Sequence, residues 1–120
     1  MKKLALVLPL LLLMGCTSIE RSAYNTAVAS KKFLDSVKAK HPECAAGQAT
    51  SLCTGLRKAT AAKDLLVDAG EAYCGGKQFD TGGACQPPAK GTPQFTQLTD
   101  KLKTALAGYS QTEKDLRGLL

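Results

Sequence analysis

The chain has 120 residues, with 16 Lys and Arg against 10 Asp and Glu and a formal net charge of +6. This length is enough for one small domain. Aromatic residues make up 5% and Trp is absent, so the core has to be built from Ala, Leu and Val. The positive charges form no dense Lys/Arg block and no nucleic-acid-binding motif occurs, so we expect no nucleic-acid partner.

The first sixteen residues carry an export pattern. Lys2 and Lys3 precede an apolar run over 4–13, which is shorter than the ~20 residues that span a bilayer as a helix. The run ends in Leu13-Met14-Gly15-Cys16, and the whole segment resembles the signal peptide of a bacterial lipoprotein. The resemblance implies cleavage before Cys16, a diacylglycerol on its thiol, and an acyl group such as palmitate on the new amine. The alternative is an ordinary secretory signal in which Cys16 lies near the cut by chance.

Under the lipoprotein interpretation, residues 1–15 are the signal peptide and 16–120 form a single helical domain. Loss of Lys2 and Lys3 leaves 16 − 2 = 14 cations against 10 carboxylates, a side-chain balance of +4. Two or three acyl chains anchor a protein stably to a membrane. Thr17, in place of Asp, favours the outer membrane facing the periplasm if the host is Gram-negative.

The first predicted helix covers about 18–40. Small and apolar residues recur at steps of three and four, as Ala23, Ala27, Ser30, Leu34 and Val37. Lys38 and Lys40 complement the negative end of its dipole. His41-Pro42 stops it, because the residue before proline is disfavoured in the helical region.

The second predicted helix covers about 49–74, and Gly75-Gly76 ends it because glycine adopts the left-handed cap at no steric cost. Its apolar stripe is Leu52, Leu56, Ala59, Ala62, Leu66, Ala69 and Tyr73. The third covers about 93–118 and starts at Thr92-Pro93, an N-cap followed by proline at the first helical position. Its stripe is Phe95, Leu98, Leu102, Ala105, Tyr109, Thr112, Leu116 and Leu119. Glu113 and Arg117 are spaced for an ion pair, which we expect on the outer face.

Each stripe needs an apolar partner, and loops connect the helices. The predicted fold class is therefore all-α, a small antiparallel up-down-up three-helix bundle. The segment 75–91 holds five of the 11 glycines and Pro87-Pro88. It is predicted to be a long loop, with Phe79 folded back to cover the end of the bundle. The alternative is that Phe79, Lys77 and Lys90 contact lipid headgroups.

Four cysteines follow Cys16, and an even number in a short exported chain indicates two disulfides. Cys53 and Cys74 would lie about 30 Å apart along the second helix, too far to pair. In an antiparallel bundle the local pairs Cys44–Cys53 and Cys74–Cys85 remain. A four-thiolate zinc site and a redox enzyme are the alternatives, and both are disfavoured because no Cys-x-x-Cys occurs.

Little in the sequence indicates catalysis. His41 is the single histidine, and Glu43 is near it, but no nucleophile pattern accompanies them. Asp64, Asp68 and Glu71 lie on one helical face without the spacing of a Ca²⁺ loop, so a solvated face is the simplest interpretation. We expect no enzyme, with no catalytic, cofactor-binding or metal-binding residues and no cofactor.

The leading functional hypothesis is a non-catalytic, membrane-anchored envelope lipoprotein that binds an envelope protein. One alternative resembles the lipoproteins by which phages or mobile elements exclude superinfection. Another is a small lipid-binding or small-molecule-binding module. Because the first helix begins close to Cys16, the Cys74–Cys85 loop should face the membrane. The segment from His41 to Cys53 should point away from it and be free to meet a partner.

Overall fold

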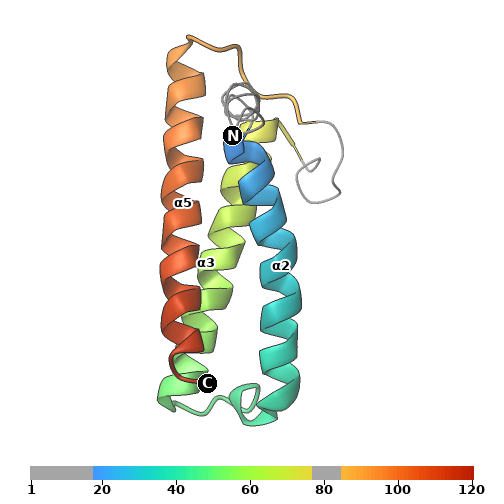
Figure 1. Ribbon diagram of the computed structural model, residues 1–120, viewed down its shortest axis with the longest axis vertical. Coiled ribbons are helices and arrows are strands. Elements are labelled where there is room, and N and C mark those ends of the chain that lie inside the picture. Colours follow the sequence, from blue (N-terminus) through green and yellow to red (C-terminus); the bar gives the residue numbers. More distant parts are fainter. Residues whose placement is uncertain (1–17, 77–84) are drawn as a thin grey trace, which may run out of the picture.

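The computed structural model describes residues 18–76 and 85–120. It contains three long helices, α2 (Ser18–Lys40), α3 (Ser51–Cys74) and α5 (Pro93–Arg117), and a short 3₁₀ helix, η1 (Pro42–Cys44), after α2. The long helices lie side by side and alternate in direction (Figure 1). The described ranges contain no strand. The predicted all-α, up-down-up three-helix bundle is confirmed.

The helices begin at side-chain caps. Thr50 Oγ1 accepts a hydrogen bond from the Cys53 amide at 3.1 Å, so α3 begins at Ser51, two residues after the predicted start. Thr92 Oγ1 accepts from the Phe95 amide at 3.2 Å, and α5 begins at Pro93 as predicted. Each cap satisfies an amide that has no partner within the first helical turn.

Glycine and proline end the first two helices. Gly75 has φ of +80° and caps α3 in the left-handed conformation, which favours a residue without Cβ. After α2 the chain turns at His41, and Pro42 occupies the start of η1, where its missing amide costs nothing. The end of α5 is at Arg117, one residue before the predicted end.

The core follows the three predicted stripes. Tyr109, Leu102, Leu66 and Leu116 are among its largest buried side chains. The buried apolar residues are Ala23, Leu34, Val37, Cys53, Leu56, Ala59, Leu66, Tyr73, Cys74, Leu102, Tyr109 and Leu116. The polar Ser30 of the first stripe is also fully buried, with its hydroxyl bonded to the Ala27 carbonyl at 2.7 Å.

Leu119 is the exception, with 48% of its surface exposed. The helix has ended at Arg117, so Leu119 no longer follows the helical repeat. The end of its side chain instead lies over Gly55, whose missing Cβ leaves room for it. The most extensive helix pairing is between α3 and α5, while α2 packs mainly on α3. In the described part of the chain, no helix combines the length and apolarity needed to cross a membrane.

Candidate interaction surface

The structure forms both disulfides, Cys44–Cys53 and Cys74–Cys85, and they lie at opposite ends of the bundle. These are the two pairs that the helix lengths predict. Cys16 lies outside the described residues, as do Lys77 and Phe79. The predicted lipidation and the predicted cover of the bundle end by Phe79 therefore stay predictions.

The Cys44–Cys53 end, formed by residues 41–57, is held by short-range hydrogen bonds. Backbone amides of Cys44, Ala45, Ala46 and Gly47 each donate to a carbonyl three residues earlier. The Arg57 guanidinium donates to the Gln48 carbonyl at 3.1 Å and so fastens the turn to α3. The turn is ordered by these contacts in addition to the disulfide.

His41 Nδ1 lies 3.0 Å from Glu43 Oε1 at the same end. Hydrogen bonds from the backbone and from His41 lower the pKa of the Glu43 carboxyl. Cys44, directly after Glu43, is committed to a disulfide and offers no thiolate. The His41–Glu43 pair thus has no cysteine nucleophile beside it.

A groove runs between α2 and α3 and opens at two adjoining hollows of about 560 Å³ and about 420 Å³. Asp64 lines both hollows and marks where they meet. Tyr24 lies towards one end and His41 towards the other, so the groove follows most of α2. We call it the α2–α3 groove.

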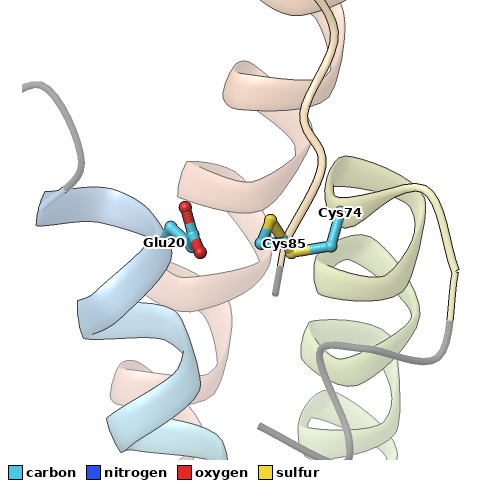
Figure 2. Close-up of side chains that lie close together, drawn as sticks. All are labelled: Glu20, Cys74 and Cys85. Carbon is cyan, nitrogen blue, oxygen red and sulfur yellow. A yellow bond between two sulfur atoms is a disulfide. The ribbon is translucent and has the colours of Figure 1, made fainter. Parts of the chain in front are cut away.

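The Cys74–Cys85 end, formed by residues 18–24, 73–76 and 85–95, has a different chemistry. Figure 2 shows the Glu20 carboxylate of α2 beside the disulfide that joins the end of α3 to the following loop. The carboxylate oxygen and both sulfur atoms lie within 4.8 Å of one another. The two sulfurs are bonded to each other and offer no thiolates, so in this oxidised form the group is not a metal site.

Aromatic residues support this end. The rings of Tyr73 and Phe95 lie with centroids 6.1 Å apart and are tilted by 50°. Burial and, secondarily, the Glu20 charge raise the pKa of the Tyr73 hydroxyl. Tyr73 and Phe95 thus meet at this end, whereas Tyr24 lines the α2–α3 groove. The cysteine spacing gives no signal for the approach of Glu20, which depends on how α2 is rotated.

The predicted ion pair on α5 forms, with Arg117 Nε 3.5 Å from Glu113 Oε2. Its expected position on the outer face was wrong. Glu113 also accepts a hydrogen bond from the buried Tyr109 hydroxyl at 3.1 Å, and the Arg117 guanidinium lies 3.9 Å from the ring centre of Phe33. The pair therefore lies at the edge between α5 and α2, where Arg117 stays exposed and Glu113 is partly buried. Burial, followed by the charge of Glu113, raises the pKa of Tyr109 well above its ordinary value.

The acidic row of α3 is only partly a solvated face. Asp64 and Asp68 are exposed, as predicted, but both line the α2–α3 groove. Asp64 forms an ion pair with its neighbour Lys63 at 3.1 Å. Asp64 and Asp68 thus lie on one rim of a groove whose other charged residues are mostly cations.

Comparison with protein-family models, with curated proteins and with solved structures found no match for this chain.

Proposed function

We propose that this chain is a lipid-anchored protein of the bacterial cell envelope whose helical body binds another envelope protein. The observation that carries the proposal is the sequence Leu13-Met14-Gly15-Cys16 after a charged start and a short apolar run. Two disulfides support it, because they persist in oxidising compartments outside the cytoplasm. With α2 beginning at Ser18, a lipid on Cys16 would hold the bundle by its Cys74–Cys85 end.

A binding role is favoured over catalysis. In the described residues the cysteine beside His41 and Glu43 is oxidised, which removes the strongest nucleophile near the single histidine. The hollows between the helices are open grooves on the surface. Small ligands are usually held in sites that bury most of their surface, whereas an open groove suits a segment of another macromolecule.

Mass spectrometry of the full chain expressed in a Gram-negative host tests the anchor. The proposal expects the membrane-extracted protein to begin at Cys16 and to carry a diacylglycerol thioether. Cys16→Ser should abolish the lipid and release the protein from membranes. Met14→Ala is the matched control and should leave lipidation intact. A wild-type protein that lacks lipid and fractionates as soluble would contradict the anchor.

Crosslinking in cells tests the partner. A photoreactive residue at Ala45, exposed at the Cys44–Cys53 end, should yield one reproducible adduct, and the same residue at Ala107, exposed on α5, serves as the control. Equal adducts from both positions, or none from positions spread over all three helices, would contradict a specific protein partner.

A further inference from the structure

The α2–α3 groove is long. From Tyr24 to His41 it follows 17 residues of α2, or about 25 Å at 1.5 Å per residue. Both hollows open to solvent and adjoin at Asp64. An elongated occupant fills such a groove, whereas a compact small molecule would occupy one hollow and stay largely in water.

The floor of the groove is apolar. Ala27, Val28 and Val67 line the first hollow, and Leu56 and Ala61 line the second. Val28 is 41% exposed, although it belongs to a helix whose other large aliphatic residues in this stretch, Leu34 and Val37, are buried. This exposed apolar surface would be removed from water by an occupant that presents apolar side chains.

The rims are basic. Five cations line the two hollows, against two carboxylates, Asp64 and Asp68; the cations are Lys31, Lys32, Lys38, Arg57 and Lys63. Asp64 is already paired with Lys63. Within residues 18–76 and 85–120, no carboxylate lies within ion-pair distance of Lys31, Lys32 or Lys38. The groove therefore attracts a partner with negative charges along its edges.

Shape and charge together select one kind of occupant. Helices of three-helix bundles leave grooves into which a further amphipathic helix can dock, with apolar residues at i, i+3, i+4 and i+7 facing the floor. Acidic side chains at the edges of that helix would reach the lysines of α2. An acyl chain would cover the floor but would leave one side in water along its whole length.

We propose that the α2–α3 groove is the docking site for an amphipathic helix with acidic flanks, supplied by a partner protein. This inference rests on the proposed function of the body as a protein-binding module, and it names the surface and the partner chemistry. The proposed surface is the side of the bundle adjacent to the turn at residues 41–53, and His41 and Cys44 lie at one end of it.

Binding of a designed peptide tests the proposal. The probe is a fluorescent helical peptide of about 17 residues, the length of the groove at 1.5 Å per residue, with Leu on one face and Glu on its flanks. The full chain is presented in nanodiscs of phosphatidylcholine, and fluorescence anisotropy is recorded at low and physiological salt. The same peptide with Lys in place of Glu is the charge control.

We expect the acidic peptide to bind and the basic peptide not to bind, with affinity that falls as salt rises. The double substitution Lys31→Glu and Lys38→Glu should weaken binding about tenfold or more, because each rim contact turns from attraction to repulsion. Lys101→Glu with Lys103→Glu makes the same charge change on exposed positions of α5 and should alter affinity less than about twofold. Unchanged thermal unfolding midpoints establish that both variants are folded.

Three results would overturn the proposal. One is equal binding of the acidic and basic peptides, and another is an equal loss in the α2 and α5 variants, which would show unspecific attraction. The third is binding of the chain to phosphatidylglycerol vesicles through Lys31 and Lys38 without binding of the peptide, which would assign the groove to lipid headgroups. Ala45 lines one end of the groove. If the peptide fails while crosslinking at Ala45 still yields a partner, the acidic-helix assignment therefore falls and the protein-binding role stands. If the peptide does not bind and the crosslink does not form, both the groove assignment and the protein-binding role are contradicted.

Discussion

The two ends of the bundle are closed by disulfides of nearly equal span, 9 and 11 residues, but their surroundings differ. The Cys44–Cys53 end has cations nearby and a turn fixed by several consecutive backbone hydrogen bonds. At the Cys74–Cys85 end a carboxylate lies beside the disulfide, and the Gln86 amide bonds to the Cys74 carbonyl at 3.0 Å. Similar covalent closure is thus combined with different neighbouring side chains and with different hydrogen-bond support.

The difference in hydrogen bonding indicates how far the local order of each end depends on its disulfide. In the chain-entropy model, closing either loop contributes about 3 kcal/mol, because the contribution depends only weakly on loop length. Removing each disulfide should nevertheless have different effects on the structure around it. The turn at 41–50 retains its backbone hydrogen bonds, whereas the chain after Cys85 loses its covalent link to α3.

Removal of each disulfide gives the largest expected effect. Cys44→Ala with Cys53→Ala, and Cys74→Ala with Cys85→Ala, should each lower the free energy of unfolding by about 3 kcal/mol in chemical denaturation. Hydrogen exchange should show loss of protection at Gln86 in the second variant, and retained protection at Ala45 and Ala46 in the first. Similar loosening at both ends would mean that local hydrogen bonds do not distinguish them.

The next effect concerns the pH dependence of stability. The folded-state pKa of Tyr109 is raised above its unfolded value of about 10, so its neutral form is favoured by folding. The contribution of neutral Tyr109 to the free energy of unfolding is fully present below about pH 10 and is lost as the pH rises towards the folded-state pKa. Tyr109→Phe should lower stability at pH 7 by about 1.5 kcal/mol, since the hydrogen bond to the Glu113 carboxylate is lost.

The alkaline loss of stability should also be shallower in Tyr109→Phe than in wild type. Tyr73→Phe, at the Cys74–Cys85 end, is the comparison because the pKa of Tyr73 is raised as well. Reversible urea unfolding of both variants is measured between pH 8 and about 10.5, a range that spans the unfolded pKa of tyrosine. An unchanged slope in Tyr109→Phe would show that Tyr109 does not titrate with unfolding.

Substitutions at the two helix caps, one at each end of the bundle, should have smaller effects on stability. Thr50→Ala at one end and Thr92→Ala at the other should each cost about 1 kcal/mol of unfolding free energy. The cost should be greater for Thr92, whose hydroxyl accepts from the Phe95 amide and also donates to the Ala89 carbonyl at 2.7 Å. Thr50→Ser and Thr92→Ser keep the hydroxyl and should retain most of the stability. Equal losses in the Ala and Ser variants would assign the effect to the missing methyl group.

The smallest predicted effect is on reduction rate. A thiolate attacks one sulfur, a mixed disulfide forms, and the other sulfur leaves as a thiolate. Glu20 repels both the attacking and the leaving charge. At a separation of 4.8 Å, the upper limit for these atoms, the repulsion in water is about 0.9 kcal/mol, so Glu20→Gln should speed reduction of Cys74–Cys85 by glutathione about fourfold. Alkylation and mass spectrometry measure the reduction of both disulfides in the same sample. The reduction rate of Cys44–Cys53 is the internal control.

A cationic thiol such as cysteamine sharpens this comparison, since the ammonium group offsets the charge of the attacking sulfur. Its rate at Cys74–Cys85 should change less on Glu20→Gln than that of glutathione. Equal acceleration with both thiols would indicate that the substitution opens the structure instead of removing a charge.

Much of the fold could be predicted from particular residues. Thr92-Pro93 marks the start of α5, and Gly75 marks the end of α3, because capping depends on local backbone conformation and on short side chains. The stripes through Leu66 and Leu102 identify the core, since a helix presents the same face every three or four residues. The disulfide pairs follow from helix length and alternating direction.

The candidate site could be predicted only in part. The position of Asp64 and Asp68 on one exposed face is visible in the helical repeat, and so is the spacing of Lys31 and Lys38 by two turns. That these faces adjoin across a groove depends on the rotation and crossing of α2 against α3, which the repeat does not specify. The same limit explains why the pair Glu113–Arg117 was placed on the outer face although it lies against Tyr109 and Phe33.

By itself, then, the sequence determined the number of helices, their limits to within two residues, the core stripe of each and the pairing of Cys44, Cys53, Cys74 and Cys85. All of these follow from interactions within a few helical turns or from chain length. Only the tertiary structure decided which faces of different helices meet. It brought the Glu20 carboxylate beside a disulfide, turned Glu113 towards the core, and joined the lysines of α2 to Arg57 and Lys63 of α3 along one groove. These contacts join residues distant in sequence, and their geometry is set by how the side chains of three helices pack together.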